Sequence, residues 1–257
     1  MTLNSVTRFV VPIDWNERDS WDYALAYANR ICESAEDNIR DAVLLVHTKV
    51  QIDSTVLADH IGDRTAKALS AGRHAKMLSG AMLRLETERK LNFLPNKTVL
   101  IVFFADDRLL ELVDGLMNVA GVVVVPSNLN SVEEWKKRWN PKVHGQTAPT
   151  EKVDLIEDST VVNALNSITS MVNLATGIGH NSDKQFADHT FRILRAKGHN
   201  LDTNSVKSWA IQNGWKPKDA EKLSQLAEKI SRLKNKPSLS KIYNAKERYV
   251  RWQESGK

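Results

Sequence analysis

Short apolar runs alternate with amphipathic segments through the first half of the chain. Each run is long enough for a buried strand, whereas the segments between the runs repeat apolar residues at helical spacing. Continuous apolar strands separated by helices are typical of a parallel sheet covered on both faces. We therefore predict an α/β fold with an open, mainly parallel, Rossmann-like sheet. The predicted strands cover residues 8–13, 42–46, 82–87, 98–104 and 121–126.

Helices are expected between and after these strands. A helix over 56–77 carries Gly62 and Gly72, which weaken a helical pattern. Asp106 or Asp107 supplies a capping oxygen for the helix that follows the strand over 98–104. The predicted helices of this half are 21–32, 56–77, 109–116 and 131–139.

Only helical periodicity is found in the second half. Gly198, Gly214 and Pro237 separate segments with one apolar face, as expected of helix ends. The helices predicted there are 159–176, 183–197, 205–213, 217–233 and 239–252. We predict three parts of the chain: an α/β domain over 1–141, a linker with the amphipathic helix 159–176 over 142–182, and a basic helical domain over 183–257.

Three stretches near the start of the chain carry a family resemblance. They are Val10-Val11-Pro12-Ile13-Asp14, then Ser20 to Ala28 with its Ala-Leu-Ala-Tyr-Ala pattern, and Val43-Leu44-Leu45-Val46-His47. Together they make residues 9–47 similar to the opening of the universal stress protein family. The resemblance implies a Rossmann-like open sheet, frequent dimerisation and, in some members, ATP binding.

The phosphate-binding part of that family is not found here. Members that bind ATP carry a glycine-rich motif after the fourth strand, where glycines let backbone N–H groups approach the phosphates. The matching segment, 105–115, has one glycine and four acidic residues, which would repel a triphosphate. The resemblance therefore implies the fold, with Asp14 facing a ligand, but not ATP hydrolysis.

Asp14, Asp106 and Asp107 are candidate ligand-facing residues. Each follows a predicted strand, and open α/β sheets place their ligands at the carboxyl ends of the strands. The alternative, which the sequence favours, is that they cap solvent-exposed strand-to-helix turns.

Composition narrows the class of protein. Of the 257 residues, 42% are hydrophobic and 26% charged, and no apolar run is long enough to span a bilayer. The lone Cys32 cannot form an internal disulfide and lies in an apolar helical pattern, so we expect a buried thiol in a cytoplasmic protein with no membrane association. The seven histidines lack metal-type spacing, and no nucleophile or Walker motif is present. We predict no cofactor, no metal and a non-enzymatic role.

Charge is divided unevenly along the chain. Residues 181–257 hold 17 Lys and Arg against 8 Asp and Glu, whereas the first 180 residues hold 19 against 23. A concentrated positive field attracts polyanions such as nucleic acid. The alternative is a helical domain whose basic face is simply solvated.

The predicted helices over 205–213 and 217–233 resemble a helix-turn-helix unit. Ala210, Gly214, Ala220 and Leu223 have the spacing that lets two short helices cross closely. Lysines suit phosphates rather than base edges, so sequence-tolerant binding is expected. Trp215 either fills the core or stacks on a base. The candidate nucleic-acid-binding residues are Lys216, Lys218, Lys222, Gln225, Lys229, Arg232, Lys234 and Lys236.

Two apolar features are candidate protein-binding surfaces. One is the heptad seam of the helix over 159–176, and the other is the pair Trp135 and Trp139, four residues apart on one helix face. Tryptophan is favoured at interface hot spots, but the favoured alternative for both features is packing within their own domain. The seam residues are Val161, Leu165, Ile168 and Val172.

The sequence thus leads to a first hypothesis and two alternatives. The first is a binding or regulatory protein whose basic helical domain contacts nucleic acid through phosphates. The second is a subunit of a protein assembly, joined through the 161–175 seam and the Trp135/Trp139 face by a partner protein or by self-association. The third and weakest is a nucleotide-binding sensor or enzyme at the Asp14 end of the sheet.

Overall fold

The computed structural model describes residues 6–34, 39–146 and 154–255. The chain divides into two compact units, Met1–Lys152 and Val153–Lys257, called here the sheet unit and the helical unit. The fold class is α/β followed by all-α, as predicted. The division falls earlier than the expected domain start at residue 183, because the helix expected in a linker packs inside the helical unit.

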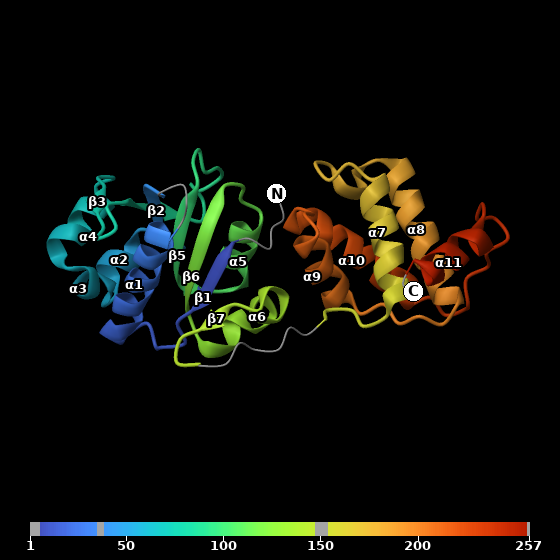
Figure 1. The fold of residues 1–257 in the computed structure, drawn as a ribbon, viewed down its shortest axis with the longest axis horizontal. Coiled ribbons are helices and arrows are strands. Elements are labelled where there is room, and N and C mark those ends of the chain that lie inside the picture. Colours follow the sequence, from blue (N-terminus) through green and yellow to red (C-terminus); the bar gives the residue numbers. More distant parts are fainter. Residues whose placement is uncertain (1–5, 35–38, 147–153, 256–257) are drawn as a thin grey trace. The chain divides into compact units, whose positions relative to one another are not determined.

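The sheet unit is built on a seven-stranded sheet with the order β3-β4-β2-β5-β6-β1-β7 (Figure 1). All neighbouring strands are parallel except β3, which runs antiparallel to β4. Strand β5 is buried along its whole length, as its continuous apolar sequence predicts. The strands are β1 (Thr7–Val10), β2 (Asp41–Val46), β3 (Ala75–Lys76), β4 (Met82–Thr87), β5 (Thr98–Ala105), β6 (Val119–Pro126) and β7 (Lys142–Val143).

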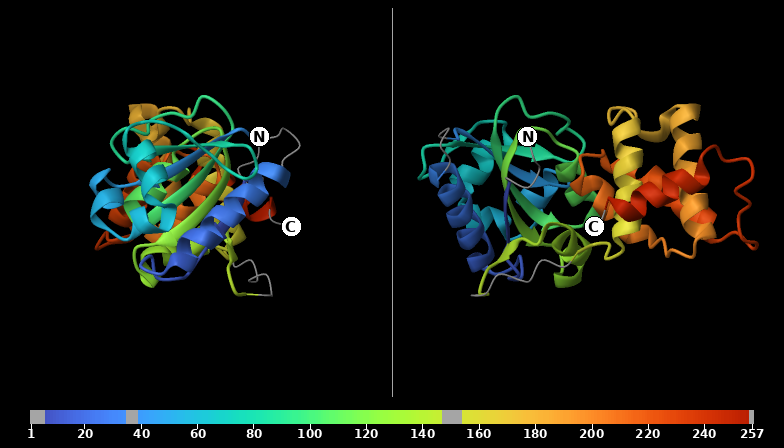
Figure 2. Two further views of the ribbon diagram at one scale, coloured as in Figure 1. Left: turned by 90° about the vertical axis from the view of Figure 1, so that its left-hand side faces the viewer. Right: turned by 45° about the vertical axis from the view of Figure 1, so that its right-hand side comes forward.

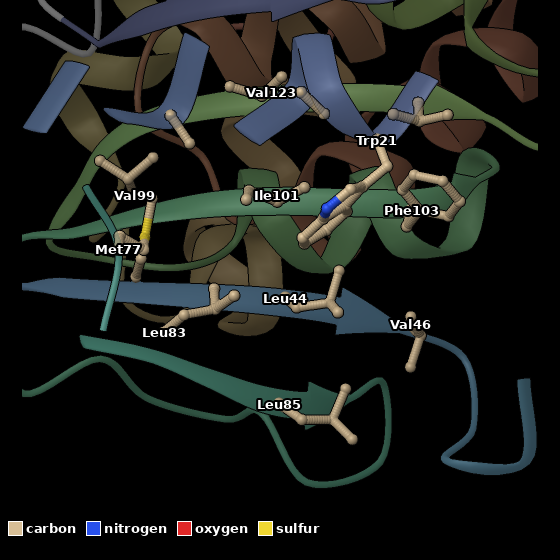
Figure 3. Close-up of a cluster of buried hydrophobic side chains, with 14 of the residues drawn as sticks. Trp21, Leu44, Val46, Met77, Leu83, Leu85, Val99, Ile101, Phe103 and Val123 are labelled. Atoms are coloured by element: carbon tan, nitrogen blue, oxygen red, sulfur yellow. The ribbon is translucent and has the colours of Figure 1, made fainter. Parts of the chain in front are cut away.

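Helices cover both faces of this sheet (Figures 1 and 2). One face packs against α1 (Arg18–Ser34), α3 (Leu57–Ile61) and α4 (Asp63–Ser70). The other face packs against α5 (Asp107–Asp114) and α6 (Glu133–Trp139). On the first face, Trp21 of α1 meets Phe103 of β5 edge to face, with ring centroids 6.2 Å apart (Figure 3).

The helix expected over 56–77 is broken. A short α2 (Val50–Ser54) precedes it, α3 ends at Gly62, and α4 ends before Gly72. Gly62 and Gly72 have φ values of +89° and +77°, which only glycine adopts readily, so both stop a helix. The chain after Gly72 then forms β3 instead of a last helical turn.

The helical unit consists of five α-helices and a 3₁₀ turn in its described residues, 154–255. Asp158 caps the first helix and Asp202 caps α9, each accepting a backbone N–H. Pro217 is the first residue of α10, where its missing N–H costs nothing. The elements are α7 (Ser159–Met171), η3 (Gly177–Gly179), α8 (Asn181–Ala196), α9 (Thr203–Gln212), α10 (Pro217–Ser231) and α11 (Ala245–Glu254).

Two of these helices are shorter than predicted. Val172 has extended dihedral angles, so α7 ends at Met171 rather than near Thr176. The last helix begins at Ala245 rather than near Leu239, and residues 232–244 form a connecting segment that projects from the unit (Figures 1 and 2). Apolar residues of that segment, including Pro237 and Ile242, are nevertheless buried, which explains why its sequence reads as the start of an amphipathic helix.

Candidate nucleic-acid interface

Helix α10 presents one polar face to solvent and buries the other. Its exposed residues follow one another four, three, four and three positions apart, which places them on one side of a helix. From Lys218 to Arg232, 14 residue steps, the rise along the axis is about 21 Å. We call this set the α10 stripe; it consists of Lys218, Lys222, Gln225, Lys229 and Arg232.

Some charges of the α10 stripe are matched by carboxylates on the same helix. Lys222 Nζ lies 2.8 Å from Asp219 Oδ1, and Arg232 Nη2 lies 2.6 Å from Glu228 Oε1. Both cations are more than half exposed, so the pairs are weakly stabilising and leave the cations accessible. The Gln225 amide donates to Glu221.

Other cations have no such partner. Within the described residues, Lys218, Lys229, Lys234 and Lys236 make no ion pair, and all four are exposed. Lys216, also exposed, donates a hydrogen bond to the carbonyl of Ala175. All eight residues predicted to bind nucleic acid are therefore on the surface, and the last two extend the α10 stripe into the segment that follows it.

The expected pair of short helices is present. Helices α9 and α10 pack against each other and are joined by Asn213 to Lys216, with Gly214 at φ +88° ending α9. Ala210, Ala220 and Leu223 are fully buried at this junction.

Trp215 does not face a ligand. It is 2% exposed, and its indole Nε1 donates to Thr169 Oγ1 at 2.9 Å, which ties the start of α10 to α7. Trp209 is buried as well. Of the two alternatives for Trp215, the core position is therefore correct, and stacking of Trp215 on a base is not available in this fold.

The heptad seam lies inside the helical unit. Its four residues are 8% exposed or less, and α7 packs against α8 and α11. Asn163 of α7 also donates a hydrogen bond to the carbonyl of Trp252 in α11. The predicted partner-binding residues of the seam are therefore buried in internal contacts: Val161, Leu165, Ile168 and Val172.

Trp135 and Trp139 hold α6 against α5 within the sheet unit. Their indole N–H groups both donate to Asp114 Oδ1, at 3.1 and 2.9 Å, and Arg138 donates to Asp114 Oδ2 at 2.6 Å. Burial raises the pKa of Asp114, and the Arg138 cation opposes this shift. The guanidinium of Arg8 stacks 3.7 Å from the Trp139 ring centroid, and burial lowers its pKa to about 10. The two tryptophans thus serve a buried charge cluster rather than an open surface.

The three candidate aspartates lie after β1 and β5, at the carboxyl edge of the sheet. Asp106 caps α5 by accepting the backbone N–H of Leu109, and Asp107 is an exposed residue of its first turn. Asp14 is exposed and accepts two hydrogen bonds from Asn16, one from the backbone and one from the side chain. Asp14 and Asp106 therefore stabilise local turns, as the favoured alternative predicted.

A second charged cluster at this edge was not predicted as a site. His47 follows β2, and its Nδ1 donates to Glu88 Oε2 at 3.0 Å, while its Nε2 lies 3.3 Å from Asp106 Oδ2. Arg108 closes the cluster with a 2.6 Å ion pair to Glu88. The hydrogen bond from His47 lowers the pKa of Glu88, and Arg108 adds to this effect against partial desolvation.

This cluster lies between β2 and β5, the two strands from which the chain crosses over to opposite sides of the sheet. After β2 the chain crosses to β4 on one side, whereas after β5 it crosses to β6 on the other, and the connecting helices cover opposite faces. Such switch points are the usual ligand sites of open α/β sheets. Here His47 lies between two carboxylates, with Glu88 at Nδ1 and Asp106 at Nε2, so both ring nitrogens already have a neighbour within the fold. The sequence placed His47 at a strand end, but only the strand order brings Glu88 to it.

The helical unit contains a further polar cluster that sequence reasoning missed. His199 Nδ1 is hydrogen-bonded to Asp158 Oδ2 at 2.5 Å, and its Nε2 to the Tyr249 hydroxyl at 3.0 Å. Desolvation tends to raise the pKa of Asp158, but the hydrogen bonds from His199 and the Val161 amide outweigh it and lower that pKa. The cluster joins the start of α7 to α11. His199 is 41 residues from Asp158 and 50 residues from Tyr249, so no local sequence pattern links the three residues.

Metal-binding clusters and membrane-spanning helices are both lacking in the described residues. The described residues contain no group of three or more His, Cys, Asp or Glu side chains placed to hold a metal ion. Among the helices in that part of the chain, none combines the length and apolar character needed to cross a bilayer. Cys32 is buried, as predicted, and burial raises the pKa of its thiol.

Comparison with known families assigns one part of the chain. Residues 157–253 match a family described as a domain of unknown function, DUF1889. The match begins beside the Asp158 cap of α7 and ends within α11, so it covers the α-helices of the helical unit and less than half of the chain. No curated protein and no solved structure matches the sequence. The resemblance of residues 9–47 to universal stress proteins is not confirmed by these comparisons.

Proposed function

We propose that this protein binds nucleic acid through the helical unit, with the α10 stripe and Lys234 and Lys236 contacting phosphates. The observation that carries the proposal is a set of four exposed lysines, on and beside one helix face, that have no carboxylate partner among the described residues. Lysine acts on phosphates as a point charge, and the binding energy comes largely from released counterions.

The length of the α10 stripe suits several contacts at once. Phosphates follow one another every 3.4 Å along one strand, so about 21 Å of helix faces about six of them. The exposed stripe is dominated by lysine, with one glutamine and one arginine, and base reading needs bidentate donors. The proposed mode is therefore tolerant of sequence.

In this proposal the sheet unit is a scaffold in the cytoplasm. Its resemblance to universal stress proteins supports the Rossmann-like fold without the family's phosphate cradle, and at its switch point Glu88 is already bonded to His47 and Arg108. The alternative of an assembly subunit has less support, because both faces offered for it pack internally.

The test is binding of the full chain to labelled DNA and RNA by fluorescence polarisation at low salt. The double variant Lys218→Ala/Lys229→Ala removes two unmatched charges and should weaken binding to all sequences alike. A matched control, Lys67→Ala/Lys76→Ala, removes two exposed lysines of the sheet unit and should bind as the wild type does. Wild-type protein that binds neither polymer at low salt, or equal weakening by both double variants, contradicts the proposal.

A further inference from the structure

The segment between α10 and α11 exposes one aromatic ring. Tyr243 is 85% exposed. Among the Phe, Tyr and Trp side chains in the described residues of the helical unit, it is the one that is exposed, since the others are buried or half-buried. An aromatic ring held in water leaves its apolar faces uncovered, and such faces are the usual platforms for bases.

The backbone beside Tyr243 is anchored. The preceding residue, Ile242, is 8% exposed, and its N–H donates to the carbonyl of Leu239 at 3.0 Å. The following residue, Asn244, has a left-handed conformation at φ +50° and begins α11, with its carbonyl accepting the N–H of Arg248 at 2.9 Å. The ring is thus carried between a buried residue and a helix start rather than on a free loop, which reduces the entropy lost when a ligand covers it.

Positive charge surrounds the ring in the sequence and continues from the α10 stripe. Residues 232–246 contain five cations and no Asp or Glu. Four of these cations are exposed lysines that make no ion pair within the described residues. They are Lys234, Lys236, Lys241 and Lys246.

An exposed ring among lysines matches the chemistry of a single strand. Bases of a duplex stack on one another and hide their faces, whereas bases of a single strand can stack on a protein ring while the backbone follows the cations. We propose that residues 232–246 bind single-stranded nucleic acid, with one base stacked on Tyr243 and the adjoining phosphates held by the lysines. This inference rests on the proposed function and names the form of nucleic acid that the same surface prefers.

The test compares a labelled 12-residue oligothymidylate with a mixed-sequence duplex of equal length, using the full chain. One base–aromatic stack is worth about 1–3 kcal/mol, so Tyr243→Ala should weaken single-strand binding roughly 5- to 100-fold. Duplex affinity should stay within about twofold, and the salt dependence of single-strand binding should not change, because no charge is lost. Tyr243→Phe keeps the ring and should bind as the wild type. Phe93→Ala, at a ring of the sheet unit that is 67% exposed, is the matched control and should have no effect.

The outcomes separate this inference from the proposed function. If Tyr243→Ala binds the single strand as the wild type does, or loses both ligands equally, the stacking inference is wrong. The phosphate-binding proposal then still stands, provided that Lys218→Ala/Lys229→Ala weakens binding. Failure of the wild type to bind either ligand overturns both.

Discussion

The carboxyl edge of the sheet and the outer face of α10 carry similar charged side chains in opposite arrangements. At the sheet edge, His47 and Arg108 meet Glu88, and Asp106 lies on the other side of the imidazole. On and beside α10, four lysines make no ion pair within the described residues, and two other cations pair only at exposed positions. The first set of charges is satisfied within the fold, and the second remains available to a partner.

This difference shows why the count of charges does not identify a binding surface. At the switch point of the sheet unit, Arg108 and His47 already contact the carboxylates there. A ligand that binds at this point would have to displace these contacts. Unmatched lysines, by contrast, can neutralise the phosphates of a polyanion, which releases the counterions condensed on it. This difference between the two regions can be tested by removing charges in each region and by measuring stability and binding separately.

The largest expected effect on stability is at the buried cluster of the sheet unit. Asp114→Ala leaves the Arg138 cation buried and two indole N–H groups without their acceptor. We expect the free energy of unfolding to fall by about 3–5 kcal/mol, as measured by denaturant titration of tryptophan fluorescence. The control Asp107→Ala removes an exposed carboxylate of the same helix and should change stability by about 0.5 kcal/mol or less. Equal stability of the two variants would show that the buried pair does not hold α6.

A smaller effect is expected at the switch point. Glu88→Gln weakens the hydrogen bond from His47 and the pair with Arg108, and partial exposure limits the loss to about 1 kcal/mol. The pKa of Glu88 is lowered in the fold, so its carboxylate stabilises the protein above the unfolded value of about 4.3. That stabilisation is lost as the pH falls through the lower folded pKa.

The stability difference between wild type and Glu88→Gln should therefore be constant near pH 7 and shrink below about pH 4. Thermal unfolding in buffers from pH 3 to pH 7 measures it. A difference that grows as the pH falls would contradict the assigned direction of the pKa shift.

The smallest effect on stability is expected on α10. Lys218→Ala/Lys229→Ala removes two charges that make no ion pair with any described residue, so the free energy of unfolding should change by about 0.5 kcal/mol or less. Circular dichroism during thermal unfolding measures this. A loss above about 2 kcal/mol would mean that these lysines support the fold and are not a free surface.

Much of the fold could be predicted from local patterns. The continuous apolar runs gave β2, β5 and β6 nearly at their observed bounds, and periodicity gave α1, α8 and α10. The lengths of α7 and α11 were overestimated, because Val172 and Ile242 continue an apolar pattern while the backbone leaves the helix. Periodicity reports which residues are buried and not how the backbone between them runs.

The candidate sites also differ in whether sequence spacing alone can predict them. The α10 stripe could be predicted because its residues lie on one helix, where sequence spacing fixes the geometry. The clusters of His47 with Glu88 and of His199 with Asp158 and Tyr249 join residues about 40 and 50 positions apart. Their contacts follow from strand order and helix packing, which sequence spacing does not specify.

The most direct measurement of the central claim is the salt dependence of nucleic-acid binding by the full chain. The proposed phosphate contacts involve six cations, namely the four unmatched lysines together with Lys222 and Arg232. They predict that log K falls with log salt concentration at a slope of about −5 for duplex DNA. The slope should become shallower by about 2 in Lys218→Ala/Lys229→Ala and stay unchanged in Lys67→Ala/Lys76→Ala. A wild-type slope near zero, or one that the α10 variant leaves unchanged, would contradict the account.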